Sequence, residues 1–235
     1  MKHLLRAFLV TQLIVFSLFS TGFASFLDKG CGISQAMFPR ISGGHDEELM
    51  AKPWMVYLHI SNKFICGGSL IHSTGHCFGD RYNNQRIIAR LGEHNSQTRR
   101  DCDEDECAPP HREYLIINKI RHPSFQNSRL GETPDESESS VLQTAYMKNV
   151  DRFRCRYFYG YNVDHTHICA GSYNSYVGKG DSGSPLGAVI EHMNSLRFVQ
   201  FGIVSHHRKP YYGVAVFTNV LAYTNWIHRV INAFK

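Results

Sequence analysis

The stretch Gly180-Asp181-Ser182-Gly183-Ser184-Pro185 decides the interpretation of this chain. Ser182 follows Gly180-Asp181 and precedes Gly183, and glycine permits a tight turn and a close approach of the backbone. On such a turn the Ser182 hydroxyl would project, and the neighbouring N–H groups would point at one spot. Main-chain donors arranged in this way can hold the oxyanion that forms when a serine attacks a carbonyl. Taken alone, the stretch is also compatible with a plain Gly-Ser turn.

On both sides of this stretch the chain predicts short β-strands. Runs rich in β-branched and aromatic residues alternate with Gly and Asn turns, at 55–60, 64–66, 86–91, 113–117, 198–204 and 213–217. Many short strands of this kind indicate a sandwich or barrel. The last segment differs, because apolar residues recur at helical spacing from Val220 to Phe234. We therefore expect an all-β fold that ends in an amphipathic helix.

Composition and the first residues set the class of protein. The 235 residues are 43% hydrophobic and carry a net charge of +5 without a long basic run, which argues against nucleic acid as the partner. Residues 1–24 predict a signal peptide, with Lys2 and Arg6 before a mostly apolar run that is short of the roughly 20 residues of a membrane span. No later segment predicts a membrane span. We expect a secreted, extracellular protein.

Seven cysteines in a secreted chain suggest three disulfides and one cysteine left over. They stand at Cys31, Cys66, Cys77, Cys102, Cys107, Cys155 and Cys169. An odd cysteine in an oxidising compartment either pairs with another chain or has lost its partner.

Further motifs stand around the Ser182 stretch in a fixed order, and together they resemble the S1, chymotrypsin/trypsin-like family of serine proteases from Ile41 to Lys235. The motifs are Ile41-Ser42-Gly43-Gly44, Cys66-Gly67-Gly68-Ser69-Leu70-Ile71, Gly75-His76-Cys77, Arg90-Leu91-Gly92-Glu93-His94, His122-Pro123, Val141-Leu142-Gln143-Thr144-Ala145, Ile168-Cys169-Ala170-Gly171, Gly202-Ile203-Val204-Ser205 and Tyr223-Thr224-Asn225-Trp226-Ile227. The resemblance implies two antiparallel six-stranded barrels, a C-terminal helix and endopeptidase activity on protein substrates. The Cys102 to Cys107 insertion resembles arthropod clip-type immune and developmental proteases, but no clip domain is expected before Arg40.

The resemblance implies roles for individual residues. Ser182 would be the nucleophile, His76 its general base, and the N–H groups of Gly180 and Ser182 the oxyanion hole. Residues 25–40 would be a short propeptide, and an activating trypsin-like protease would cut after Arg40. The new amine of Ile41 would then pair with Asp181 in the domain spanning 41–235. Such a buried ion pair needs both partners, so the chain would be made as a zymogen.

The resemblance also implies a specificity pocket at Tyr176, Ser205 and His206. Tyr176 stands where trypsin-like enzymes place Asp, so cleavage after Lys or Arg is not expected. His206 and His207 replace the usual Trp-Gly; a zinc site is less favoured here than an exposed pair, since no third ligand lies at ordinary spacing. The implied disulfides are Cys66–Cys77, Cys102–Cys107 and Cys155–Cys169, which leaves Cys31 as the odd cysteine.

The chain departs from the family pattern in two places. The Asp that would orient His76 should lie between His122-Pro123 and Val141, but Leu130 runs directly into Gly131, and Asp135 falls beyond that join in an acidic loop. An apolar strand is also missing just before Gly75. The first barrel is therefore expected to be reduced. Three interpretations stay open: a working endopeptidase, a non-catalytic homologue that binds partners in a proteolytic cascade, and an incomplete gene product.

A second acidic segment, Arg99 to Glu106, could bind calcium together with Glu93. The alternative, a solvated loop closed by Cys102 and Cys107, is favoured. We expect no metal and no cofactor.

Overall fold

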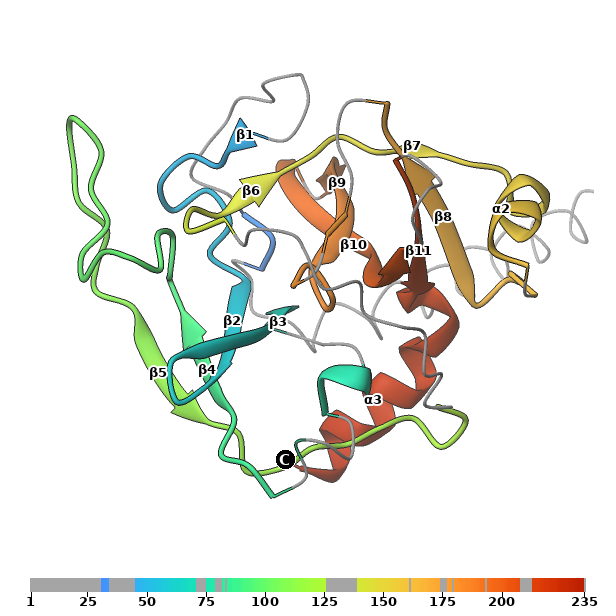
Figure 1. Ribbon diagram of the computed structural model, residues 1–235, viewed down its shortest axis with the longest axis horizontal. Helices are drawn as coiled ribbons and strands as arrows, with labels where there is room; N and C mark the ends of the chain where they lie inside the picture. Colours follow the sequence, from blue (N-terminus) through green and yellow to red (C-terminus); the bar gives the residue numbers. More distant parts are fainter. Residues whose placement is uncertain are drawn as a thin grey trace, which may run out of the picture.

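The computed structural model describes residues 31–33, 45–70, 75–78, 82, 84–125, 139–160, 162–173, 177–178, 180–192, 194–207 and 213–234. The predicted signal peptide, the residues around the Arg40 cleavage site, Asp135 and Tyr176 lie outside these ranges. Two antiparallel sheets stand side by side, and the chain ends in a helix that packs against them (Figure 1).

The first sheet has the strand order β3-β2-β4-β5, formed by β2 (Met55–Ile60), β3 (Lys63–Ser69), β4 (Ile88–Leu91) and β5 (Arg112–Leu115). A two-residue turn joins β2 to β3, and both of its residues have positive φ: 49° at Ser61 and 64° at Asn62. The core of this half consists of Val56, Leu58, Cys66, Cys77 and Ile87. Among the described strands, β3 and β5 are the edges of this sheet.

The second sheet has the order β7-β8-β11-β10-β9, formed by β7 (Lys148–Asn149), β8 (His167–Gly171), β9 (Pro185–His192), β10 (Ser195–His207) and β11 (Val214–Asn219). The core on this sheet includes Val216, Val204 and Phe217 from its strands and Cys155 from the helix packed against it. The short pair β1 (His45–Asp46) and β6 (Gln143–Thr144) brings the start of the described domain beside the link between the sheets.

Helical turns complete the architecture. They are η1 (Gly75–Phe78), α2 (Arg152–Tyr159), η3 (Val220–Tyr223) and α3 (Thr224–Ala233). The expected C-terminal helix is confirmed as η3 followed by α3. The ring of His122 packs edge-on against Tyr223 and Trp226, at 5.0 and 5.2 Å between centroids, so the segment after β5 contacts this helical end.

Helix α2 was not predicted from the sequence. Asp151 caps its first turn by accepting from the N–H groups of Phe153 and Arg154, and Gly160 ends it at a φ of 70°. Two caps at this short spacing define an eight-residue helix that hydrophobic periodicity alone does not indicate.

Three disulfides are formed, Cys66–Cys77, Cys102–Cys107 and Cys155–Cys169, and these are the pairs that the family resemblance implies. Cys31 is the free cysteine among the described residues. It belongs to a short segment, 31–33, that lies against β10: Phe198 N donates to the Gly32 carbonyl at 2.8 Å, and Arg197 Nη1 donates to the Cys31 carbonyl at 2.7 Å.

The expected fold class is confirmed as all-β with a C-terminal helix. The described strands form sheets of four and five strands, so the first sheet is the smaller one, in agreement with a reduced first barrel. None of the helices described here is long and apolar enough to cross a membrane.

Two glycines have nearly the same positive φ but different surroundings. Substituting each by alanine therefore separates the cost of atomic crowding from the cost of backbone strain. Gly213 has a φ of +73° and a Cβ there would overlap the Ser172 carbonyl oxygen, whereas Gly160 has a φ of +70° with nothing within 4 Å. We expect Gly160→Ala to lower the free energy of unfolding by about 1 kcal/mol through strain alone. Gly213→Ala should cost about 3 kcal/mol because overlap with backbone adds to that strain. Urea unfolding followed by tryptophan fluorescence measures both, and equal losses would contradict the crowding at Gly213.

Candidate active site

Ser182 lies on a tight turn that leads into β9. Gly180 and Gly183 on either side have φ values of 97° and 92°, a region that residues with a Cβ rarely adopt. Ser182 is half-buried, whereas Asp181 is exposed. The glycines of the motif are therefore required by the path of the backbone, as the sequence suggested.

Along this turn, N–H groups that donate a hydrogen bond to a described residue alternate with N–H groups that do not. The N–H of Asp181 donates to Gly178 at 3.3 Å and that of Gly183 donates to Val204 at 3.0 Å. Within the part of the chain that the structure describes, the N–H groups of Gly180 and Ser182 have no acceptor. The turn thus offers two main-chain donors next to the Ser182 side chain, at the positions predicted for an oxyanion hole.

The first sheet touches this turn through β3. The N–H of Gly67 donates to the Gly180 carbonyl at 3.1 Å, and the ring of Phe64 lies so close that a Cβ on Gly180 would be 2.7 Å from its Cε1 atom. A Cβ on Gly67 would overlap the Ser184 hydroxyl oxygen. Glycine at 67 and 180 therefore lets the two sheets meet at the serine turn.

His76 reaches the same place through its neighbour. It lies in η1 directly before Cys77, which is fully buried (0% exposed) and is joined to Cys66 on β3. The Cys77 Sγ atom is 3.8 Å from the Ser182 carbonyl oxygen. The backbone of His76 is thus one residue from a contact with Ser182, although its ring lies outside the described residues.

Asp181, the predicted partner of the Ile41 amine, has a main-chain donor close by in the structure. Its Oδ2 atom accepts a hydrogen bond from the Gly178 N–H at 2.7 Å, and the residue is exposed. Arg40 and Ile41 are outside the described ranges, so the expected ion pair stays a prediction.

The expected pocket residues are only partly described. Ser205 is half-buried at a bulge of β10, where the register with β11 shifts between Val204 and His206. Val177 is buried beside this sheet. Tyr176 and the side chain of His206 lie outside the description, so the specificity of the pocket stays a prediction.

The acidic loop uses its carboxylates for its own structure. Burial raises the pKa of Asp101, but hydrogen bonds from the Thr98 hydroxyl and from the N–H groups of His94 and Asn95 hold it below its usual value. Glu93 pairs with Arg90 at 2.8 Å and with His111 at 3.3 Å. The described residues contain no group of three or more His, Cys, Asp or Glu side chains that could hold a metal ion.

One polar cluster was not identified from the sequence. The His59 ring, 1% exposed, has its Nε2 atom 3.1 Å from Glu113 Oε1, and Arg90 donates to the same carboxylate at 2.7 and 2.9 Å. Hydrogen bonding from Arg90 holds the pKa of Glu113 below its usual value. Arg90 and Glu113 face each other across β4 and β5, so knowledge of the strand register would have revealed the pair.

Comparisons with known proteins give one consistent family. The trypsin family model matches residues 41–113 and 119–227. Serine protease grass of Drosophila melanogaster is 26% identical over 86% of this chain and 70% of its own length. CLIP domain-containing serine protease B9 of Anopheles gambiae is 28% identical over 84% of this chain, which spans 64% of that relative.

Solved structures agree on the fold. The crystal structure of the Drosophila Grass clip serine protease of the Toll pathway has a TM-score of 0.74 at 24% identity, and covers 94% of this chain and 78% of its own. Mouse neuropsin, a serine protease, has a TM-score of 0.62 at 21% identity, and covers 80% of this chain and 98% of its own.

The contact between β3 and the serine turn can be tested with one substitution that creates a steric clash and a second that removes it. Gly67→Ala places a methyl group on the Ser184 oxygen, and we expect the free energy of unfolding to fall by about 1–3 kcal/mol. Ser184→Ala removes that oxygen, and the next atoms are 3.5 Å or more away, so the double variant should recover most of the loss. Urea unfolding of the two single variants and the double variant measures the coupling, and strictly additive losses would contradict this packing.

Proposed function

Since the chain belongs to the trypsin family of serine proteases, we propose that it is a secreted endopeptidase zymogen that cleaves peptide bonds through Ser182. The observation that carries the proposal is the pair of N–H groups on Gly180 and Ser182, which have no acceptor among the described residues and lie beside the Ser182 side chain. Two such donors stabilise the negative charge that develops on an attacked carbonyl oxygen.

In the proposed reaction the Ser182 hydroxyl oxygen bonds to the carbonyl carbon of the substrate, and its proton passes to the His76 ring. The carbonyl oxygen becomes an oxyanion facing Gly180 and Ser182. The same proton then passes from His76 to the leaving amine as the peptide bond breaks, and water hydrolyses the acyl-enzyme by the reverse roles. The contact of Cys77 Sγ with the Ser182 carbonyl supports this role for His76, because it holds the preceding residue beside the serine turn.

We propose that turnover is slow because the sequence lacks the Asp that orients the histidine. Without that carboxylate the imidazole is not held in one tautomer, and its protonated form is not stabilised. Removing this group from a Ser-His-Asp site lowers kcat about ten-thousandfold. The oxyanion hole and substrate binding still leave a residual acceleration of about a thousandfold over water.

We propose that cleavage after Arg40 by another trypsin-like protease rearranges the serine turn. The Asp181 carboxylate accepts from the Gly178 N–H at 2.7 Å, two residues from the oxyanion donor of Gly180. A charged pair between Asp181 and the new Ile41 amine would draw Asp181 inward and hold the N–H groups of Gly180 and Ser182 in place for the substrate. One similar structure is a clip serine protease of the Toll pathway, which supports a place for this chain in a pathway of proteases.

A second candidate is a non-catalytic homologue that acts in such a cascade by binding. The missing Asp favours it, and so does the position of the two sequence gaps, which follow β3 and β5, the edges of the smaller sheet. A chain without the orienting Asp would keep the surface of a protease but would not hydrolyse peptides efficiently.

Labelling with a fluorophosphonate separates the two candidates. After cleavage behind Arg40, the probe should react slowly at Ser182, since the reaction needs the serine and the oxyanion hole but not an efficient leaving-group step. Ser182→Ala should abolish labelling, whereas Ser184→Ala, two residues away, should retain it. Mass spectrometry locates the adduct; an unlabelled cleaved protein would overturn the endopeptidase proposal in favour of the binding candidate.

Peptide hydrolysis tests the claim of slow turnover. We expect kcat/KM roughly ten-thousandfold below that of an intact trypsin-family protease assayed on the same peptide library. The rate should rise with pH as the His76 ring loses its proton, and His76→Ala should remove that dependence. Turnover comparable with an intact protease would show that another group orients His76.

A further inference from the structure

Helix α2 presents two large aromatic side chains to solvent. Phe153 is 79% exposed and Tyr157 is 80% exposed, and their i, i+4 spacing places them on one face of the helix. The opposite face carries Cys155 and Tyr159, which are buried in the core of the second sheet. Exposed aromatic groups gathered on one face mark an interaction surface more often than isolated apolar residues do.

Three arginines surround the aromatic pair. Arg152, Arg154 and Arg156 are all exposed, and the helix itself contains no acidic residue. Asp151 precedes it, but its carboxylate accepts from the helix N–H groups. In the described ranges none of the three guanidinium groups forms an ion pair with a carboxylate.

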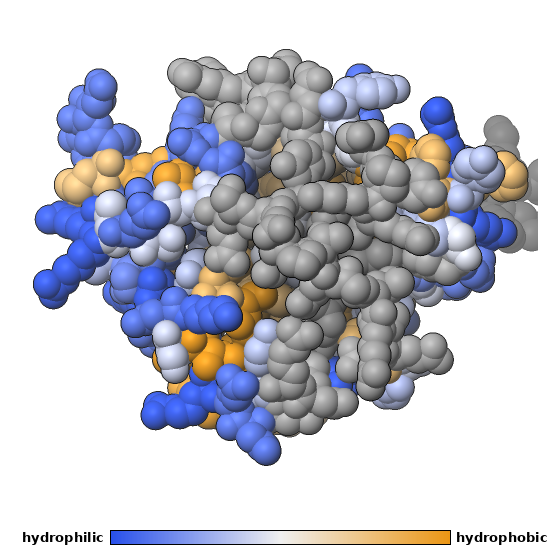
Figure 2. Space-filling view, viewed as in Figure 1, coloured by the Kyte–Doolittle hydropathy of each residue, from blue (hydrophilic) through white to orange (hydrophobic). Residues whose placement is uncertain are grey.

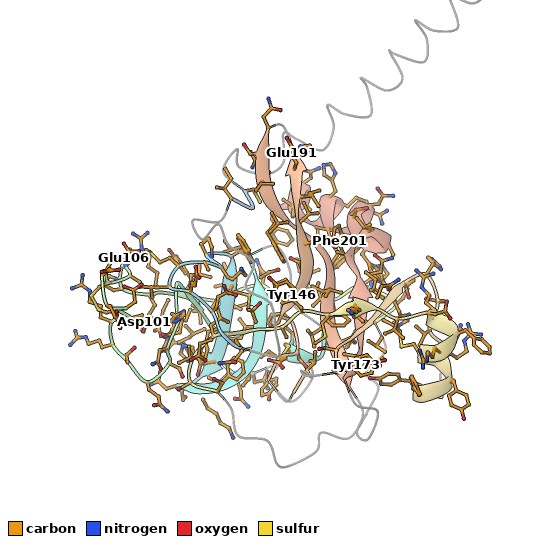
Figure 3. The ribbon with its side chains drawn as sticks, turned by 90° about the horizontal axis from the view of Figure 1, so that it is seen from above. Asp101, Glu106, Tyr146, Tyr173, Glu191 and Phe201 are labelled. Atoms are coloured by element: carbon orange, nitrogen blue, oxygen red, sulfur yellow. A yellow bond between two sulfur atoms is a disulfide. The ribbon has the colours of Figure 1, made fainter. Side chains whose placement is uncertain are left out.

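The acidic loop of the same molecule does not neutralise these arginines. Asp101 and Glu106 lie at the end of the molecule opposite α2, in the long loop between β4 and β5 (Figures 1 and 3). The end that carries α2 shows hydrophilic and apolar residues side by side at the right of Figure 2. The exposed arginines of α2 therefore stand beside Phe153 and Tyr157 without an acidic partner from that loop.

The helix is held in place before any partner arrives. The Cys155–Cys169 disulfide joins it to β8, and the Tyr159 hydroxyl donates to the Val214 carbonyl on β11 at 2.6 Å. Asp151 and Gly160 fix its two ends. A preorganised surface loses little conformational entropy when it binds, so its side chains can contribute most of their contact energy to affinity.

We propose that the α2 face, defined as Arg152, Phe153, Arg154, Arg156 and Tyr157, binds an acidic segment with apolar side chains in a partner protein. Arginine and aromatic residues are the side chains most enriched among those that dominate protein interfaces. The guanidinium fork matches a carboxylate with two parallel hydrogen bonds, and the aromatic pair supplies apolar area between the charges. This surface is independent of the proposed chemistry at Ser182.

The probe for the test is a fluorescein-labelled peptide of Glu-Glu-Leu repeats, titrated with the full chain and followed by fluorescence anisotropy. We expect saturable binding that weakens with added salt and is absent with a Lys-Lys-Leu peptide. The double variants Phe153→Ala/Tyr157→Ala and Arg154→Ala/Arg156→Ala should each weaken binding about tenfold or more. All four side chains are exposed, so circular dichroism melts of both variants should match the parent chain.

A control variant removes one apolar and one basic side chain elsewhere on the surface, Leu221 on η3 and Arg229 on α3, which are both exposed. The double variant Leu221→Ala/Arg229→Ala should leave the affinity for the peptide unchanged. Absence of peptide binding, or equal weakening in the control, would overturn the proposal. A heparin-derived oligosaccharide that binds more tightly than the peptide and ignores the aromatic pair would also overturn it, by assigning the face to sulfated glycans. So would self-association in sedimentation that the aromatic variant abolishes.

Discussion

The contact between β3 and the serine turn is the constraint on which the rest of this structure depends. Gly67 donates to the Gly180 carbonyl, and Cys77, tied to Cys66 on the same strand, places its sulfur against the Ser182 carbonyl. The first contact joins backbone to backbone, and a Cβ would crowd the Ser184 hydroxyl at position 67 or the Phe64 ring at position 180. The Ser69 hydroxyl also donates to Gln200 on β10, and the β3 contacts together place η1, with His76, beside the serine turn.

The sequence predicted well what local rules control. The strands around 55–60 and 198–204 and the helical end after Val220 follow from periodicity, and the disulfides follow from the family resemblance. Helix α2 was missed because Arg and aromatic residues alternate in it, and its boundaries depend on caps at Asp151 and Gly160. The His59–Glu113–Arg90 cluster was missed because it requires the register of three strands, which no local pattern supplies.

The two breaks in the sequence are related in space. One follows β3 and the other follows β5, and these are the two edges of the four described strands of the first sheet. Tyr114 and Leu115 on β5 are exposed, so none of the described residues covers their side chains. The second sheet keeps its five strands, its two core clusters and the serine turn that begins β9.

The difference between the two sheets determines which groups of the proposed catalytic site the chain retains. The proposed oxyanion donors belong to the turn before β9, on the larger sheet, and each donor of this kind is worth about a hundred- to a thousandfold in kcat. The orienting carboxylate would belong to the reduced half, and its absence costs about ten-thousandfold. Two such donors together match or exceed the contribution of the missing carboxylate, so in the proposed reaction the chain still polarises a carbonyl but turns over slowly. Helix α2 packs on the same sheet as these donors, so the proposed binding face and the proposed oxyanion hole share one support.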